Sequence, residues 1–202
     1  PSSFPGGVSV VAASVGVMRV IYNTATSLSG FIADEENSLA WLFAVDSATQ
    51  PDHEAFLAGI GVLVSGSTTY EWVLREEDLV AHPEKWPAYY GARPYYVFTS
   101  RDLPVPGGAD VRFVRGSVAE TLPAIREAAG AGDAWVIGGG DLAGQFLDAG
   151  ALDEVQVSVA PAALTGGAPV LPRRVGPDRL RLRSAERFDQ FVHLTYDVLP
   201  PS

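Results

Sequence analysis

Short apolar runs recur along the chain, and amphipathic helical patterns separate several of them. Parallel strands need long crossover connections and are buried on both faces, so apolar runs that alternate with helices favour a mainly parallel sheet. We therefore predict an α/β fold with helices on both faces of one central sheet. The expected strands are residues 19–23, 62–65, 95–99, 111–114, 134–137 and 155–160, and the expected helices are residues 53–59, 69–75, 118–129 and 142–149.

The C-terminal segment has a different pattern. Residues 179–183 and 192–196 alternate strictly between apolar and polar side chains, and the turn-forming pair Asp189-Gln190 lies between them. Strict alternation is typical of a strand with one solvent-exposed face, so these residues predict an antiparallel hairpin at the edge of the sheet.

Two helix ends carry specific signals. Ser117 and Glu120 have the spacing of a capping box, in which each side chain accepts a hydrogen bond from the other residue's backbone N–H. Gly150 directly follows the apolar helix pattern, at the position where a left-handed residue commonly ends a helix. We predict Ser117 as an N-cap and Gly150 as the residue just past a helix C-terminus.

Composition indicates a single globular domain, which we place at residues 18–200. The chain has 202 residues, of which 47% are hydrophobic and 19% are charged. Its formal net charge of −10 disfavours nucleic acid and anionic membranes as partners. There is no cysteine, and the three histidines, His53, His82 and His193, are widely spaced, so we expect no metal site.

The N-terminal segment, residues 1–17, is apolar but carries no lysine or arginine. It therefore lacks the charged start of a secretory signal and is too short to span a membrane. Met18 is the only methionine. We expect residues 1–17 to be a poorly ordered extension of a cytoplasmic protein that naturally begins at Met18.

The most informative motif is a strand that runs into three glycines and then into a helix, at residues 135–142. Glycines let a ligand approach the backbone closely, and they leave the first N–H groups of the following helix free to bind an anion. The motif is therefore typical of a phosphate site, although a tight turn without a ligand has the same pattern.

Three further segments carry hydroxyl, guanidinium or carboxyl side chains near the ends of expected strands and helices. Residues 66–71 follow a strand and open a helix with hydroxyl side chains, and Thr99-Ser100-Arg101 ends the next strand with a hydroxyl and a guanidinium. Both arrangements suit a phosphate. Residues 36–41 lead through a loop to Asp46, which is a candidate acid.

Taken in order, these segments resemble the dihydrofolate reductase superfamily, and more closely its branch with the reductase domain of the riboflavin-biosynthesis deaminase/reductase. The resemblance covers residues 18–198. It implies a three-layer fold with a mainly parallel sheet and an antiparallel C-terminal hairpin, NADPH bound across the strand ends, and a homodimer. The matching segments are residues 27–33, 66–71, 99–101 and 137–142, followed by the loop at residues 161–172.

The resemblance also implies roles for individual residues. Those expected to contact NADPH lie at four strand ends, and the peptide bond between Gly138 and Gly139 is expected to be cis. Ala25 lines the nicotinamide pocket and Ala33 the substrate pocket. Gly66, Ser67, Thr68 and Thr69 face the cofactor phosphates, Ser100 and Arg101 face the 2′-phosphate, and Ile137, Gly138, Gly139, Gly140, Asp141 and Leu142 hold the pyrophosphate.

Three positions depart from the pattern of the branch. Ser67 stands where an arginine usually follows the glycine, which removes one cation from the 2′-phosphate site. Ser29 stands where the branch has an aspartate, and Ala143 replaces the aromatic residue that folate reductases place beside the nicotinamide. A folate-specific role is correspondingly less favoured.

Hydride transfer to a substrate also needs a proton, and a carboxylic acid in an apolar cleft can supply it. Asp46 is the first candidate, with Trp41 as a wall of the pocket, and Asp52 is the alternative, although its position before a helix equally suits an N-cap. We expect an NADPH-dependent reductase of a small pyrimidine- or pteridine-like substrate. The alternatives are 5-amino-6-(5-phosphoribosylamino)uracil reductase and a catalytically silent nucleotide-binding protein.

Aromatic residues are concentrated between Trp86 and Tyr96. Such a segment suits either a homodimer interface or the packing of the core, and the sequence leaves both interpretations open.

Overall fold

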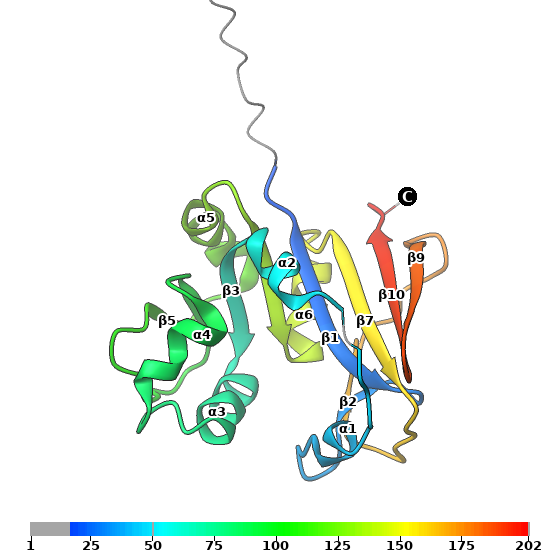
Figure 1. Ribbon diagram of the computed structural model, residues 1–202. Coiled ribbons are helices and arrows are strands. Elements are labelled where there is room, and N and C mark those ends of the chain that lie inside the picture. Colours follow the sequence, from blue (N-terminus) through cyan, green and yellow to red (C-terminus); the bar gives the residue numbers. More distant parts are fainter. Residues whose placement is uncertain (1–16, 50, 202) are drawn as a thin grey trace, which may run out of the picture.

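The computed structural model describes residues 17–49 and 51–201, and an eight-stranded sheet runs through the molecule (Figure 1). Neighbouring strands from β5 to β7 are parallel, and the β9–β10 hairpin continues the sheet in antiparallel fashion, as predicted. In spatial order the strands are β5 (Val111–Val114), β4 (Tyr95–Phe98), β3 (Ile60–Gly66), β6 (Asp133–Gly138), β1 (Val20–Ser27), β7 (Glu154–Ala160), β10 (Phe191–Val198) and β9 (Leu180–Phe188).

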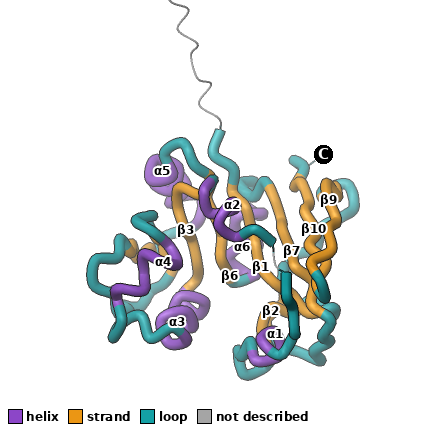
Figure 2. Tube along the Cα trace, viewed as in Figure 1, coloured by secondary structure: helices purple, strands orange, loops and turns teal. Residues whose placement is uncertain are grey.

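Helices cover both faces of the sheet, which confirms the predicted three-layer architecture. Figure 2 shows α2 in front of the sheet and α6 behind it. Val20 and Tyr22 of β1 pack on the side of α5 and α6, whereas Ile21 packs on the side of α3 and α4. The helices are α1 (Ala40–Phe43), α2 (His53–Ala58), α3 (Ser67–Glu76), α4 (Trp86–Tyr90), α5 (Val118–Ala129) and α6 (Gly140–Asp148), with a 3₁₀ turn η1 (Pro83–Lys85) before α4.

The predicted helix ends are confirmed. The Ser117 hydroxyl accepts a hydrogen bond from the N–H of Glu120, whose carboxylate accepts one from the N–H of Ser117. Gly150 has φ of +64° just after α6. The N–H groups of Gly150 and Ala151 bond to the carbonyls of Leu147 and Phe146, which is the Schellman pattern.

Two strands of the structure were not predicted. β2 (Phe31–Ala33) pairs with β8 (Ala168–Pro169) in a separate two-stranded sheet. Both strands are too short for side-chain alternation to mark them, and Pro169 argues against a strand in any pattern of propensities. Their pairing nevertheless joins the segment after β1 to the loop that follows β7.

The aromatic segment belongs to the core of the monomer. The side chains of Trp86, Tyr90 and Tyr95 are at most 8% exposed, and their rings lie within 5.6 Å of one another. Tyr89 is the partly exposed exception. Of the two interpretations of this segment, core packing is therefore the one that the structure supports.

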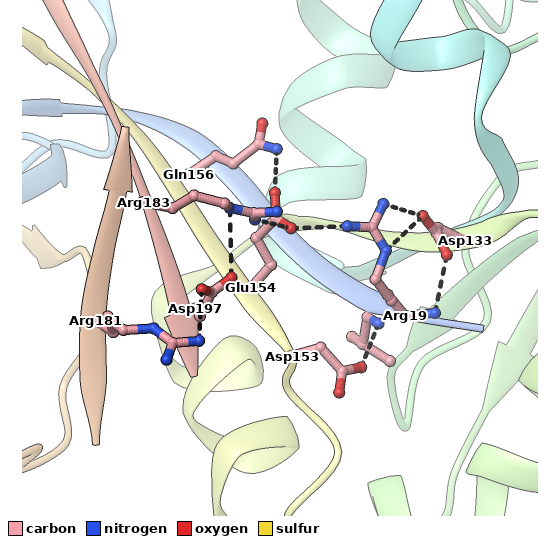
Figure 3. Close-up of polar contacts among 9 residues, drawn as sticks. Arg19, Asp133, Asp153, Glu154, Gln156, Arg181, Arg183 and Asp197 are labelled. Carbon is pink, nitrogen blue, oxygen red and sulfur yellow. Dashed lines mark hydrogen bonds and ion pairs between the residues drawn. The ribbon is translucent and has the colours of Figure 1, made fainter. Parts of the chain in front are cut away.

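A charge network joins five neighbouring strands at one edge of the sheet, namely the N-terminal ends of β6, β1, β7 and β9 and the C-terminal end of the antiparallel β10 (Figure 3). Arg19 donates to Asp133 at 2.6 Å and to Glu154 at 3.0 Å, and Arg183 pairs with both Glu154 and Asp197. The Glu154 side chain is only 5% exposed, so its charge requires these partners. The network fastens the edge hairpin to the sheet at the end opposite to the glycine-rich turn.

Candidate functional site

Three of the predicted anion-binding turns come together at one edge of the sheet. Strands β6, β3 and β4 are parallel neighbours, so their carboxyl ends meet there. The glycine turn follows β6, α3 begins at Ser67 directly after β3, and Arg101 follows β4. The carboxyl edge of a parallel sheet is the usual place for a ligand in an α/β fold.

A cleft of about 630 Å³ opens at this edge. Eight residues predicted from the sequence line it, namely Ala33, Thr68, Thr69, Ile137, Gly138, Gly139, Gly140 and Asp141. The lining also includes Thr24, Ile32, Trp72 and Arg75, which sequence reasoning missed. The alternation of β1 indicates on which face Thr24 lies, and the helical period of α3 does so for Trp72 and Arg75. Only the fold shows which of these faces meet.

The helices that begin at the cleft have no side-chain caps. Gly66 is the N-cap of α3 and Gly139 is the N-cap of α6, and neither helix has a side-chain capping bond. By contrast, Ser117 caps α5. The first N–H groups of α3 and α6 are therefore available to an anion, which the helix dipoles also favour.

The glycine turn is shaped for close approach. The Gly138–Gly139 peptide bond is cis, as predicted. A Cβ at position 138 would lie 2.9 Å from Thr69 Oγ1, and a Cβ at position 140 would collide with the Pro169 carbonyl. A Cβ at position 139 would meet nothing within 4 Å, so this backbone borders open space.

Two carboxylates at the cleft are held by cations. Asp141 accepts hydrogen bonds from Gln145 at 2.9 Å and Arg173 at 3.1 Å, and these bonds lower the pKa of its carboxyl group. Glu71 pairs with Arg101. Arg101 itself lies outside the lining of the cleft and reaches its edge through Glu71.

Some predicted cofactor residues are not in the lining of the cleft. Leu142 is 5% exposed and its side chain packs in the core, so only its backbone remains for a ligand. Its place in the pattern could not show this, because residues of the first helical turn point either to the ligand or to the sheet. The others outside the lining are Ala25, Gly66, Ser67 and Ser100.

The predicted substrate residues Trp41 and Asp46 lie together in a second hollow of about 600 Å³. Pro161 and Ala162 after β7 and the turn residue Asp189 also line it, and it shares no lining residue with the glycine-rich cleft. The structure therefore brings Asp46 and Trp41 together but places them apart from the cofactor turns.

Asp52, the alternative acid, is the N-cap of α2. Its Oδ1 accepts a hydrogen bond from the N–H of Ala55 at 2.9 Å. This contact accounts for the residue without a catalytic role.

A polar row on three strands, β7, β10 and β9, lies next to Ala25, the predicted nicotinamide position on β1. Ala25 of β1 is paired with Ser158 of β7, Ser158 with His193 of β10, and His193 with Glu186 of β9. Ser158 Oγ lies 2.9 Å from His193 Nδ1, and burial lowers the pKa of His193. Sequence reasoning assigned His193 no role beyond excluding a metal site, because cross-strand partners depend on register.

Comparison with known proteins places the chain in a family. The model of the RibD C-terminal domain matches residues 18–194, so this protein belongs to that family. The uncharacterized protein YwjB of Bacillus subtilis (strain 168) is 26% identical over 184 residues, which is 88% of this chain and 97% of YwjB. The uncharacterized protein YyaP of the same organism is 24% identical over 75% of this chain and 79% of YyaP.

Solved structures share the fold. A protein assigned to riboflavin biosynthesis in Shewanella sp. PV-4 is 25% identical, with a TM-score of 0.72 over 90% of this chain and 99% of that chain. The diaminohydroxyphosphoribosylaminopyrimidine deaminase/5-amino-6-(5-phosphoribosylamino)uracil reductase of Thermotoga maritima is 16% identical, with a TM-score of 0.62 over 90% of this chain and 57% of that chain. Within residues 17–49 and 51–201, no helix is long and apolar enough to cross a membrane.

Proposed function

We propose that this protein is an NADPH-dependent reductase that transfers hydride to a small pyrimidine- or pteridine-like substrate. The observation that carries the proposal is the cleft in which two uncapped helices begin around the glycine turn. Membership of the RibD C-terminal domain family supports the reductase class.

The residues of the cleft fit the phosphates of a dinucleotide. The backbone of Gly139 borders open space that a side chain would fill, and the hydroxyl residues Thr68 and Thr69 line the same cleft. The first N–H groups of α3 and α6 would hold the pyrophosphate, and Arg101 would hold a 2′-phosphate. When bound, NADPH would supply the hydride.

On the substrate side, we propose Asp46 as the group that orients or protonates the substrate, with Trp41 as a wall of its pocket. The indole N–H of Trp41 is buried and has no hydrogen-bond partner within the described ranges, so a substrate acceptor would satisfy it. His193, hydrogen-bonded to Ser158, is the second candidate for the proton donor. We prefer His193 to Asp52 as this second candidate, because the Asp52 carboxylate caps α2.

A narrower candidate function is reduction of 5-amino-6-(5-phosphoribosylamino)uracil, the reaction in the name of the Thermotoga protein. The family match favours it. Ser29 weighs against it, because this hydroxyl replaces the aspartate of that branch and is used in two 2.8 Å bonds with the backbone of Leu164. Ser29 thereby fastens the loop after β7 instead of offering a carboxylate.

The deciding experiment measures NADPH binding by fluorescence and then NADPH oxidation with a panel of pteridines and ribosylamino-pyrimidines. We expect binding and oxidation with at least one class of compound. Binding without oxidation would favour a silent nucleotide-binding protein, and absence of binding at millimolar NADPH would refute the proposed function.

A further inference from the structure

An ion pair occupies the end of the cleft nearest β4. Arg101 Nη1 donates to Glu71 Oε1 at 2.9 Å, and Nη2 donates to Oε2 at 2.5 Å, so the pair is bidentate. Glu71 comes from the second turn of α3, and Arg101 comes from the loop after β4. The Arg101 N–H also donates to Thr99 Oγ1 at 3.0 Å, which fixes the start of this loop.

This pair leaves the cation of the predicted 2′-phosphate site already neutralised. Nη1 and Nη2, which form the end-on bidentate edge of the guanidinium, both face Glu71. The neighbouring position that commonly carries a second cation is Ser67 in this chain. Glu71 is also the partner that lines the cleft, so a ligand at this end meets a carboxylate before it meets the guanidinium.

We infer that Glu71 sets the choice between NADPH and NADH, an inference that rests on the proposed function. A 2′-phosphate has to share the Arg101 guanidinium with the Glu71 carboxylate or displace it, and in either case it lies close to the negative charge of Glu71. An unmodified ribose meets no such competition, because a 2′-hydroxyl can donate a hydrogen bond to a carboxylate, as acidic residues do in NAD sites. Glu71 therefore reduces the preference of this protein for NADPH over NADH.

The structure also explains why the preference is reduced without NADPH being excluded. Arg75 lies four residues after Glu71 on α3, lines the same cleft, and forms no ion pair in the part of the chain that the structure describes. A glutamate four residues before an arginine is the favourable order for a helical ion pair. A carboxylate displaced from Arg101 therefore has a second cation one helical turn away.

The test compares two probes that differ only in the 2′-phosphate, namely adenosine 2′,5′-bisphosphate and 5′-AMP, by titration calorimetry. Because the competing pair is exposed, with side-chain exposures of 54% and 35%, Glu71→Gln should raise the affinity for the bisphosphate by about three- to fivefold. The affinity for 5′-AMP should stay equal or fall slightly. Glu76→Gln, which removes the same charge from an exposed position on the same helix, should change both affinities less than about twofold.

A double-mutant cycle tests whether Glu71 acts through Arg101. In an Arg101→Ala background, the gain from Glu71→Gln should be clearly smaller than in the wild type, because no guanidinium is left to release. An undiminished gain would overturn the competition mechanism. A wild-type protein that binds the bisphosphate far more tightly than 5′-AMP, with no change in Glu71→Gln, would overturn the inference altogether.

The probes keep this inference separable from the proposed function. They carry no nicotinamide, so a selectivity change in Glu71→Gln supports the role of Glu71 even if no substrate is ever reduced. NADPH binding and oxidation that do not respond to Glu71→Gln would leave the reductase standing and remove the inference. Failure of wild type and Glu71→Gln to bind NADPH, NADH or either probe would overturn both.

Discussion

The hydroxyl of Thr69 packs directly over Gly138, so that a Cβ at position 138 would lie 2.9 Å from Thr69 Oγ1. This contact joins the first turn of α3 to the glycine turn before α6. The N-termini of α3 and α6 are therefore held together by direct packing. This packing requires a residue without a Cβ at position 138.

This contact predicts opposite effects for two adjacent substitutions. Gly138→Ala should destabilise the protein by about 1 to 3 kcal/mol, because the new methyl overlaps Thr69. Gly139→Ala should fold normally, since its methyl meets no protein atom, but it should weaken NADPH binding about tenfold or more by filling the phosphate position. Denaturant unfolding and NADPH fluorescence titration measure the two effects.

A matched control for this pair is Gly59→Ala, where a methyl meets only the Phe56 carbonyl at an ordinary 3.7 Å. It should leave NADPH affinity unchanged. If Gly139→Ala binds NADPH as tightly as the wild type, the glycine turn does not hold the cofactor.

Arg101→Ala should weaken NADPH much more than NADH. Only NADPH carries the 2′-phosphate, and removal of Arg101 takes away its cation and leaves the Glu71 carboxylate unpaired beside it. Arg115→Ala is the matched control, because Arg115 is also exposed and pairs with a carboxylate, Asp102. Equal losses for NADPH and NADH would show that Arg101 does not contact the 2′-phosphate.

Asp46→Asn should leave NADPH affinity nearly intact and lower turnover about 100-fold, the usual scale of general-acid assistance. Asp52→Asn serves as a stability control, since it alters a helix cap and should cost at most about 1 kcal/mol of stability without a comparable loss of turnover. If His193→Gln loses turnover and Asp46→Asn does not, the proton donor is His193.

Stability should fall in mild acid because of buried histidine. Burial lowers the pKa of His193 in the folded protein, against opposing effects of Glu186 and Glu154, so below about pH 6.5 the unfolded chain binds more protons. The contribution is complete above this range and is lost as the pH falls. Urea unfolding should show a smaller loss in His193→Gln than in the wild type.

His53 has its pKa lowered by burial and by Arg93, so the double variant of His53 and His193 should show the flattest dependence. If the free energy of unfolding falls equally steeply with decreasing pH in His193→Gln and in the wild type, His193 is not the source of the acid sensitivity.

We predict a homodimer, which is the oligomeric state that the resemblance to the family branch implies. With the aromatic segment assigned to the core, we propose the edge hairpin as the interface. Among the described residues, β9 pairs only with β10, and Leu182 and Val192 are 52% and 42% exposed. Leu182→Lys should shift the light-scattering mass towards the monomer. A monomeric wild type at micromolar concentration would refute the prediction.

The sequence by itself determined the strands of the main sheet, the helices α2, α3, α5 and α6, and the turns at their ends. Apolar periodicity, the Ser117 capping box and Gly150 are local features, because backbone chemistry within a few residues decides them. The glycine turn at residues 138–140 was equally readable, since close contacts require glycine at positions 138 and 140. Their order along the chain sufficed to indicate the family.

Only the tertiary structure decided which side chains meet. Glu71 and Arg101 are 30 residues apart, and Ser158 and His193 are 35 residues apart. Neither pair has a local signal, because strand order and register bring the partners together. The same reason separates Asp46 from the glycine turn. The sequence placed Asp46 in a loop as the acid of the substrate pocket, but the course of the loop after α1 places it in a different hollow from the glycine turn.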